Sequence, residues 1–356
     1  MSKVYFTNMN TKPELGLLQK IGLLLKKVKL NEIIEKGKFI AIKVHFGEYG
    51  NVAFVRHNYT RVIVDKIKEL GGKPYVTDAN TLYHGSRSNA IDHVETAIIN
   101  GYTYETLGAP VIIADGLRGS DQVEVDIDGE FIKKAKISSG IALADAVVVL
   151  SHFKGHELTG FGGAIKNIGM GSAARAGKME QHSDSKPRVK EENCVACRMC
   201  ERHCPTGAIT VDKVARIDYD VCIGCGECIT MCSYDAMHPT WDSSGEIASK
   251  KMAEYAKAAL SGKKAIFVSL INNVSPNCDC YFINEPPVAP DIGIVASTDP
   301  VSIDKACIDL VIDKVGYDPF RKVHTNVTWE TQLEHAEKIG LGERDYELIE
   351  VATLNK

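Results

Sequence analysis

The stretch DAVVVLSHFKGHELTGFGGAIKNIGMG (145–171) combines the two features that decide the main fold of this chain. Its first nine residues form a short, valine-rich apolar run, which is typical of a strand buried on both faces of a parallel sheet. The residues that follow are rich in glycine, with lysine and histidine among them. Open α/β sheets place their ligands where such strands end. The stretch therefore predicts a sheet strand followed by a candidate binding loop.

Helices and short apolar strands alternate on both sides of this stretch. Runs of β-branched and other apolar residues predict the strands, and segments with helical spacing separate them. The predicted strands are FIAIKVHF (39–46), KPYVTDA (73–79), APVIIAD (109–115), KAIFVSLI (264–271) and DIGIVAST (291–298), and the predicted helices cover 59–72, 91–100, 248–262 and 299–316. This alternation predicts an α/β fold with a mostly parallel, doubly wound sheet.

Two local patterns add detail to this prediction. The stretch QVEVDIDGEFIKKAKI (122–137) alternates apolar and polar residues around Asp128-Gly129, which is typical of an antiparallel hairpin. Asp299 and Pro300 suit the cap and the first position of the last predicted helix, because proline needs no partner for a backbone N–H there.

The cysteines are concentrated in one segment. Eight of the 11 lie between Cys194 and Cys232, and none precedes Cys194. A disulfide framework would be spread along a short secreted chain. A dense group of cysteines in a long chain whose start, MSKVYFTNMN, lacks the apolar segment of a signal peptide indicates metal binding instead.

Two runs within that segment have the cysteine spacing of bacterial ferredoxins. CVACRMCERHCP (194–205) follows C-x₂-C-x₂-C-x₃-C-P, and CIGCGECITMC (222–232) repeats the spacing without the final proline. In such pairs the fourth cysteine of each run ligates the other cluster. The predicted ligands of two [4Fe–4S] clusters are Cys194, Cys197, Cys200 and Cys232 for one, and Cys204, Cys222, Cys225 and Cys228 for the other. The alternative is a pair of structural zinc sites, because CxxC pairs also bind zinc.

The cysteine-rich segment resembles the two-cluster bacterial ferredoxins, and this resemblance implies low-potential, one-electron transfer. PTGAITVDKVARIDYDVC (205–222) predicts a short strand pair between the two runs. We call residues 188–240 the cysteine insert, and we expect one α/β domain, residues 1–187 and 241–356, interrupted by this small ferredoxin-like α+β unit. The polar stretch HSDSKPRVK (182–190) marks its start.

Charge and hydropathy exclude some classes of function. The net charge is −4, whereas a nucleic-acid-binding protein needs a concentrated basic surface. No apolar run approaches the roughly 18 residues that would span a bilayer. We therefore expect a soluble cytoplasmic protein that neither binds nucleic acid nor spans a membrane.

The glycine-rich loop, residues 151–185, is the second candidate site. It contains seven glycines and several basic residues, and exposed backbone N–H groups beside lysines favour an anion. The candidate binding residues are Gly160, Gly162, Gly163 and Lys166, joined by His45 and Asp78 at predicted strand ends, and the candidate catalytic residues are His156, Lys166 and His182. The alternative is a glycine-rich connection that only carries the chain into the cysteine insert.

Three stretches together resemble a family of uncharacterised iron–sulfur centre proteins, known as domain of unknown function 362 and often fused to a ferredoxin module. The stretches are KGHELTGFGGAIKNIGMG (154–171), NCDC (277–280) and DIGIVASTDPVSIDKACIDL (291–310). The resemblance covers nearly the whole chain. It implies the interrupted α/β architecture and no particular reaction.

The glycine-rich loop also resembles the nickel-cofactor loop of the lactate racemase family. In both, a histidine is followed by an aromatic residue, two glycines and a lysine; here these are His156, Phe161-Gly162-Gly163 and Lys166, with His182 further on. The resemblance implies an acid/base role for His156, a tether role for Lys166 and a metal-ligand role for His182. Ala164-Ile165 before the lysine and the lack of a Gly-Thr-His-Arg motif depart from that family. We infer shared ancestry of the loop and not racemase activity.

Three cysteines lie outside the insert. Cys278 and Cys280 follow a predicted strand, and their thiolates could bind a further metal, form a redox pair or simply be buried. Cys307 lies within an apolar helical pattern and is expected in the core.

The sequence leaves three functions open. The first is an oxidoreductase that passes electrons from two [4Fe–4S] clusters to a small anionic substrate or cofactor in the α/β domain. The second is a non-catalytic ferredoxin-type carrier that docks to a partner enzyme, and the third is a metal-dependent isomerase. The expected partner is a redox protein or a small-molecule electron acceptor. A further small-molecule or metal cofactor stays open, as does the oligomeric state.

Overall fold

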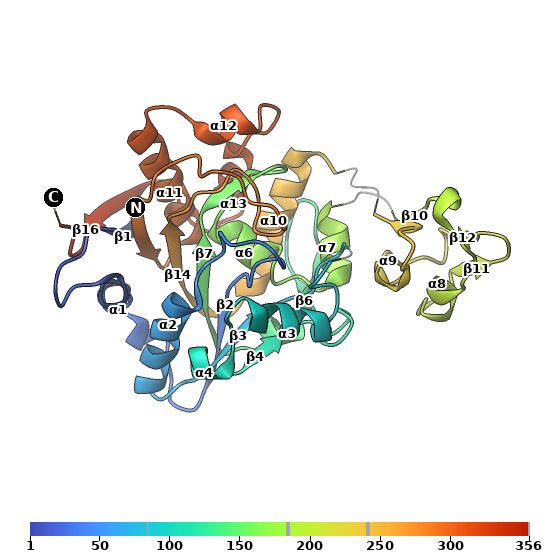
Figure 1. The fold of residues 1–356 in the computed structure, drawn as a ribbon, viewed down its shortest axis with the longest axis horizontal. Coiled ribbons are helices and arrows are strands. Elements are labelled where there is room, and N and C mark those ends of the chain that lie inside the picture. Colours follow the sequence, from blue (N-terminus) through green and yellow to red (C-terminus); the bar gives the residue numbers. More distant parts are fainter. Residues whose placement is uncertain (84, 183–185, 240–242, 355–356) are drawn as a thin grey trace.

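The computed structural model describes residues 1–83, 85–182, 186–239 and 243–354 (Figure 1). Its centre is an eight-stranded sheet in which strands from both sides of the cysteine insert are neighbours. In order across the sheet these are β16 (Tyr346–Glu350), β1 (Ser2–Asn8), β15 (Gly293–Ser297), β14 (Lys264–Ile271), β7 (Ala146–His152), β2 (Phe39–Lys43), β3 (Lys73–Asp78) and β4 (Val111–Ile113).

The sheet is mostly parallel, as the alternation of strands and helices predicted. β15 runs antiparallel to both β1 and β14, and the other neighbouring pairs are parallel. Strands β14, β7, β2 and β3 therefore end at one common edge. The loops that follow these four strands meet there.

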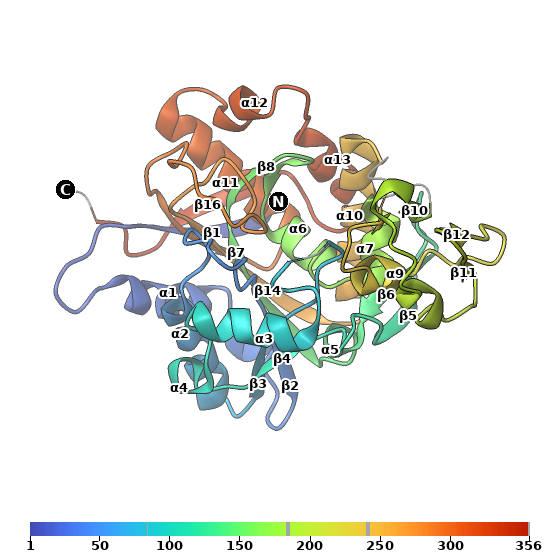
Figure 2. The same cartoon turned by 45° about the vertical axis from the view of Figure 1, so that its right-hand side comes forward.

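Helices cover both faces of the sheet (Figure 2). β7 is buried throughout, and its side chains alternate between two apolar cores: Val147 and Val149 face one, Val148 and Leu150 the other. The first core lies under α6 (Ala164–Gly169), α10 (Gly245–Leu260), α11 (Pro300–Val315) and α13 (Glu330–Lys338). The second lies under α1 (Leu17–Lys27), α2 (His57–Glu69), α3 (Ala90–Ile99) and α4 (Tyr104–Leu107).

The two local predictions are confirmed. β5 (Gln122–Asp126) and β6 (Lys134–Ser138) form the antiparallel hairpin. The Asp299 side chain accepts from the backbone N–H groups of Val301 and Ser302, and Pro300 opens α11. Cys307 of this helix is fully buried in the core.

Some elements differ from the sequence pattern. β2 ends at Lys43, so His45 lies in the loop beyond the strand. The chain ends contribute β1 and β16, and neither strand was predicted. The glycine-rich loop itself contains a hairpin of β8 (Lys154–His156) and β9 (Gly160–Gly162), followed by α6 and then by α7 (Arg175–His182). The remaining short helices are η1 (Leu30–Glu32), α5 (Ser139–Ala142) and α12 (Pro319–Val323).

The cysteine insert lies at one end of the long axis of the molecule, beyond α7 (Figure 1). β11 (Ile209–Val211) pairs with β12 (Ala215–Ile217), as predicted, and β10 (Arg188–Val189) pairs with β13 (Met237–His238) to bring the two ends of the insert together. Its other elements are η2 (Glu191–Asn193), α8 (Met199–Arg202) and α9 (Glu227–Met231). The predicted boundary at 240/241 lies outside the described residues. Among the residues described, no helix is long and apolar enough to cross a membrane.

Candidate functional site

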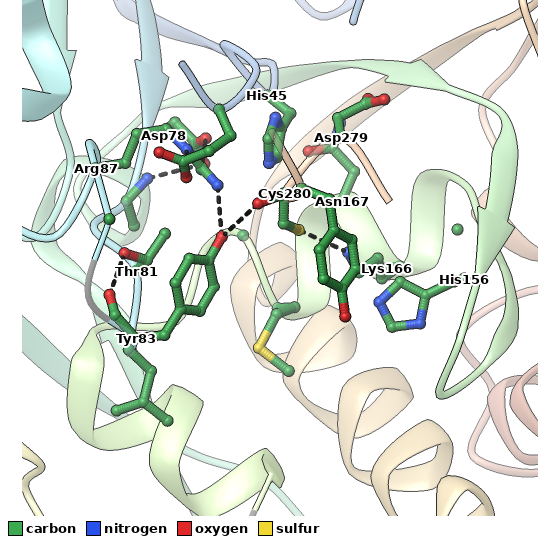
Figure 3. A pocket seen from close by; sticks show the side chains of 18 of the residues that line it. His45, Asp78, Thr81, Tyr83, Arg87, His156, Lys166, Asn167, Asp279 and Cys280 are labelled. Carbon is green, nitrogen blue, oxygen red and sulfur yellow. Dashed lines mark hydrogen bonds and ion pairs between the residues drawn. The ribbon is translucent and has the colours of Figure 1, made fainter. Parts of the chain in front are cut away.

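A cavity of about 920 Å³ opens at the common edge where β14, β7, β2 and β3 end (Figure 3). Each of the four loops that follow these strands contributes side chains to its wall. Open α/β sheets bind ligands at the carboxyl ends of their strands, so this is the expected position for a site.

The structure brings most of the predicted site residues to this cavity. Its wall includes His45, Asp78, His156, Gly162, Gly163, Lys166 and His182. Gly160 lies elsewhere: it opens β9 with a φ of +77° and faces Trp329. The roles of these residues stay predictions.

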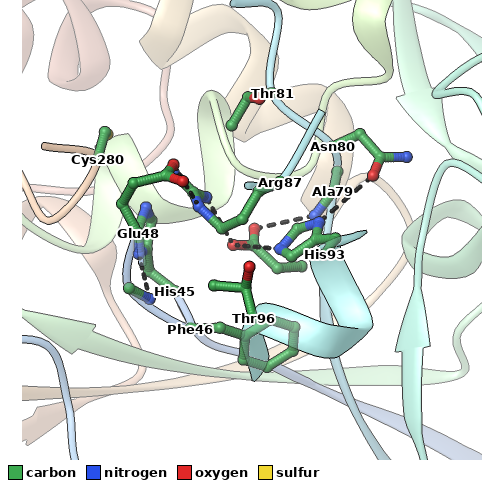
Figure 4. Close-up of polar contacts among 12 residues, drawn as sticks. His45, Phe46, Glu48, Ala79, Asn80, Thr81, Arg87, His93, Thr96 and Cys280 are labelled. Carbon is green, nitrogen blue, oxygen red and sulfur yellow. Dashed lines mark hydrogen bonds and ion pairs between the residues drawn. The ribbon is translucent and has the colours of Figure 1, made fainter. Parts of the chain in front are cut away.

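The wall near β2 and β3 is a buried network of opposite charges (Figure 4). Lys43 Nζ lies 2.9 Å from Asp78 Oδ1, and Arg87 lies 3.1 Å from Glu48 and 3.6 Å from Asp78. Burial would raise the pKa of Asp78, but the charge of Lys43 and its other neighbours holds it well below the ordinary value. Asp78 therefore stays ionised at neutral pH, and its negative charge faces the basic groups of Lys43 and Arg87.

Lys43, Glu48 and Arg87 were not predicted as site residues. Lys43 offered a signal, because it is a charged residue inside the apolar run FIAIKVHF. Glu48 and Arg87 lie in loops and carried no such signal. They meet only because β2 and β3 are neighbours in the sheet.

The opposite wall carries a pair of cysteines in a tight turn. The backbone N–H of Tyr281 donates to the carbonyl of Cys278 over 3.0 Å, so Cys278, Asp279 and Cys280 form a turn after β14. Cys278 is fully buried beneath the wall, whereas Cys280 lines the cavity. Asp279 anchors this turn to β7, because His152 Nδ1 lies 2.9 Å from its carboxylate.

Three basic side chains surround the sulfur of Cys278. Lys166 Nζ donates to it over 2.9 Å, and Lys154 Nζ over 3.6 Å. Nδ1 of His156 accepts from the backbone N–H groups of Leu158 and Thr159, so the proton of the neutral ring lies on Nε2 and can be donated to Cys278.

These contacts decide the charge on the two sulfurs. Burial would raise the pKa of Cys278, but the hydrogen bond with Cys280 and the charges of Lys154 and Lys166 hold it well below the ordinary value. The hydrogen bond with Cys278, together with burial, raises the pKa of Cys280. A negative charge on this pair is therefore more stable on Cys278 than on Cys280.

Buried nitrogen bases complete the cavity wall. Burial lowers the pKa of both His45 and His182 to about 3, so both rings are neutral at physiological pH. Burial lowers the pKa of Lys178 to about 8, and its ammonium group donates to the carbonyl of Ala173.

The glycines of the loop serve packing more than ligand approach. A Cβ at Gly155 would lie 1.9 Å from the carbonyl oxygen of Pro276, so only glycine lets β8 come this close to the cysteine turn. The backbone N–H groups of Ala164 and Ile165, at the start of α6, donate to the buried carboxylate of Asp304 over 2.6 and 2.9 Å. These two N–H groups are therefore already paired within the protein, and the anion-binding role predicted for Gly160, Gly162, Gly163 and Lys166 stays a prediction.

The cysteine insert packs against the wall of the same cavity. Leu82, which lines the cavity, and Met179 of α7 both belong to the apolar core of the insert. A Cβ at Gly226 would lie 3.1 Å from the Leu82 side chain. Beside this contact, Arg175 of α7 forms a 2.8 Å ion pair with Glu227. Leu82 thus belongs both to the cavity wall and to the apolar core of the insert.

The eight cysteines of the insert stand around two hollows. Cys194, Cys197, Cys200 and Cys232 line one, which we call the outer hollow. Cys204, Cys222, Cys225 and Cys228 line the other, the inner hollow, which also includes Gly226. Among the described residues, no three cysteine, histidine or carboxylate side chains converge on one point as ligands of a single ion would.

Comparison with known proteins identifies the family of this chain. Residues 40–309 match the family described as domain of unknown function (DUF362). The chain belongs to the DUF362 family. This match covers most of the α/β domain as well as the cysteine insert.

Parts of this DUF362 protein are also similar to components of oxidoreductases. It is 36% identical to pyruvate synthase subunit PorD of Methanothermobacter marburgensis over 76 residues, which is 21% of this chain and 88% of that subunit. It is 42% identical over 50 residues to a component of an ion-translocating oxidoreductase complex of Methanosarcina acetivorans, 14% of this chain and 19% of that component. The chain thus spans about a fifth of the latter. These relatives support iron–sulfur electron transfer as the general function.

Two solved structures align with most of this chain. The lactate racemase apoprotein of Thermoanaerobacterium thermosaccharolyticum has a TM-score of 0.46 and 10% identity, over 87% of this chain and 58% of that one. A Thermotoga maritima protein has a TM-score of 0.39 and 11% identity, over 92% of this chain and 60% of that one.

Proposed function

We propose that this DUF362 protein is an iron–sulfur oxidoreductase that reduces a small anionic substrate or cofactor in the cavity. In this proposal the cysteine insert holds two [4Fe–4S] clusters, which supply one-electron transfer when bound. The position of Leu82 carries the proposal, because this residue belongs both to the apolar core of the insert and to the cavity wall.

The arrangement of the insert cysteines suits two four-iron clusters. Each hollow is lined by three cysteines of one run and the fourth cysteine of the other run, which is the crossed pattern of two-cluster ferredoxins. Backbone N–H groups already point at three of the cysteine sulfurs: Ala215 N donates to Cys194, Ala208 N to Cys204 and Ala236 N to Cys232. Such hydrogen bonds stabilise thiolates and tune cluster potentials.

The charges and bases of the cavity suit an anion that gains protons. Lys166 is the main positive charge on the wall, because Lys43 and Arg87 already face Asp78 and Glu48. The thiolate of Cys278 and the carboxylate of Glu157 lie near Lys166. A bound anion would therefore share the positive charge of Lys166 with these two groups. His156 and Lys178 are placed to hold or donate protons beside it.

The electron donor would approach the outer hollow. Cys197 is exposed there, and the apolar side chain of Val195 beside it is also exposed. Several relatives are subunits of larger oxidoreductases, so a redox protein or a small electron donor is the expected partner. The same exposed edge favours a second candidate, a carrier that only docks to an enzyme, but such a carrier has no use for the cavity.

Metal and sulfide analysis tests the first half of the proposal. Anaerobically purified protein should contain about eight iron and about eight sulfide per chain, as expected for two cubane clusters. Zinc at about two per chain without sulfide would instead favour two structural zinc sites.

Mass spectrometry of small molecules released from the anaerobic protein tests the second half. Wild type and the exposed-lysine control Lys66→Ala should release the same anionic compound. Lys166→Ala should retain at least about tenfold less of it, since a lost charge-assisted contact costs about 1.4 kcal/mol or more. Equal retention by Lys166→Ala would mean that the glycine-rich loop is only a connection.

A further inference from the structure

The cysteine turn places two sulfurs beside one nitrogen. Lys166 Nζ lies 2.9 Å from the sulfur of Cys278 and 3.7 Å from that of Cys280. A turn also keeps alternate Cα atoms close, and closeness is what a disulfide between them requires. Cys280 lies at the wall of the cavity and Cys278 is buried just beneath it, and neither belongs to the cysteine insert.

We propose that Cys278 and Cys280 form a reversible disulfide that is the first acceptor of electrons arriving through the cysteine insert. The proposal rests on the function proposed above, and it adds the group that receives the electrons. It gives the pair a redox role that the cluster motifs do not include.

The redox step balances with the groups present. Two one-electron reductions by reduced iron–sulfur centres break the sulfur–sulfur bond, and each centre is oxidised by one electron. Cys280, which faces the cavity, takes one proton, and Cys278 stays a thiolate beside the Lys166 ammonium group. When the pair closes again, the same two electrons and the proton pass to the molecule in the cavity. The pair thus converts one-electron delivery into a two-electron reduction.

The surroundings of the turn favour the open, reduced form. Lys154, Lys166 and His156 all face the Cys278 sulfur and stabilise negative charge on it. A stabilised thiolate is also the better leaving group when a disulfide is opened. The anchored Asp279 holds the turn in place through both states.

A short route joins the insert to the cysteine pair. Leu82 packs in the apolar core of the insert, where a Cβ added at Gly226 of the inner hollow would lie 3.1 Å from its side chain. Its neighbour Tyr83 donates a hydrogen bond from its hydroxyl to the carbonyl of Cys280 over 3.3 Å. Arg87 holds that hydroxyl with a 2.8 Å hydrogen bond (Figure 3). Two consecutive residues therefore span the distance from the inner hollow to the proposed acceptor.

The test uses the full-length protein with its clusters, kept anaerobic. Diamide serves as the thiol oxidant, a photochemically reduced deazaflavin as the one-electron donor and dithiothreitol as the direct thiol reductant. Denaturing alkylation and peptide mass spectrometry then report the state of Cys278 and Cys280. Wild type and Cys204→Ala, whose inner hollow lacks a ligand, are compared, and the Cys307 peptide serves as an internal control because that thiol is buried in the core.

We expect diamide to join Cys278 and Cys280 in both proteins and dithiothreitol to open the bond in both. The photochemical donor should open it in wild type and at least tenfold more slowly in Cys204→Ala. If diamide leaves both thiols of wild type separately alkylated, the disulfide proposal is wrong while cluster-dependent reduction in the cavity still stands. If the disulfide forms but reduced clusters leave it closed, the pair is not the acceptor of the electrons and the disulfide proposal is wrong, while the iron, sulfide and released-compound measurements test the proposed function separately.

Discussion

The α/β domain and the cysteine insert differ in the apolar cores that stabilise each of them internally. The domain has two extensive apolar cores, one on each face of an eight-stranded sheet. The insert has one small core, and Cys200, Cys228 and Cys232 are themselves part of it. Its strand pairs are only two or three residues long.

This difference indicates which part of the molecule depends on a bound cofactor for its folding. A segment as small as the insert rarely buries enough apolar surface to be stable alone, so groups bound by its cysteines would contribute directly to its folding. The α/β domain has no such dependence in its cores. The domain should therefore tolerate changes that destroy the insert.

The largest expected effect is the loss of one cluster from the insert. Cys204→Ala should remove the cluster of the inner hollow, and with it about half of the iron, because a missing thiolate leaves one corner without a ligand. Iron analysis and EPR of the reduced protein measure this loss. The remaining signal should match that of Cys228→Ala and differ from that of Cys194→Ala. A match to Cys194→Ala would contradict the crossed ligand sets.

The next effect concerns the contact between the two regions. Glu227→Gln removes the partner of Arg175, whose side chain is only 2% exposed, and breaking a buried ion pair typically costs about 3–5 kcal/mol. Limited proteolysis should release the insert faster, while the α/β fragment stays resistant. Arg198→Gln, which breaks an exposed pair within the insert, is the control and should cost at most about 1 kcal/mol. Equal cleavage of both variants would mean that Arg175 does not hold the insert in place.

A smaller effect is expected inside the α/β domain. Asp304→Asn replaces a carboxylate that accepts from two backbone N–H groups at the start of α6, and it should cost about 1–3 kcal/mol because one N–H loses its partner. Thermal unfolding followed by circular dichroism measures the loss. Iron content should not change, because the site lies away from the insert.

The same variant tests a pH dependence. Burial raises the pKa of Asp304 from 3.8 to about 7, so between these values the folded state binds a proton that the unfolded state has released. The contribution of Asp304 to stability is therefore complete below about pH 4 and is lost as the pH rises to about 7. The difference in unfolding temperature between wild type and Asp304→Asn should shrink over this range. A difference that grows with pH would contradict the raised pKa.

The smallest effect probes the domain far from both sites. Gly22 lies in α1, and a Cβ there would meet only a lysine carbon at 3.9 Å. Gly22→Ala should raise the stability of the domain by about 0.5–1 kcal/mol, because glycine is unfavourable inside a helix. Chemical denaturation measures the gain, and the insert should release its iron at the same denaturant concentration as in wild type. A parallel shift in iron release would show that the two regions unfold together.

The sequence predicted most of the regular structure. The strands β2, β3, β7 and β14, the β5–β6 hairpin and the capped helix α11 follow from local patterns of apolar and turn residues. β1 was missed although Val4, Phe6 and Thr7 are buried, because its partner strands lie near the other end of the sequence. β16 was missed because none of its side chains is buried. The hairpin inside the glycine-rich loop was missed because its strands are only three residues long.

The candidate site was predictable only in part. Lys166, His156 and His182 stood out because they lie within one unusual loop. Arg87 and Glu48 did not, because their meeting depends on the order of strands across the sheet. The packing role of Gly155 and Gly163 could not be predicted either. The residues that pack against them, Pro276 and Asp304, are distant in sequence.

By itself, the sequence determined the α/β pattern and the two cysteine runs of the insert. Both are local: the period of a strand or helix and the spacing of thiol ligands are properties of short segments. Only the tertiary structure brought Lys166 to Cys278, 112 positions away, and set Leu82 against Gly226. These contacts depend on which strands are neighbours and on where the insert packs. Many weak long-range interactions together decide which strands are neighbours and where the insert packs. No short segment of sequence predicts this arrangement by itself.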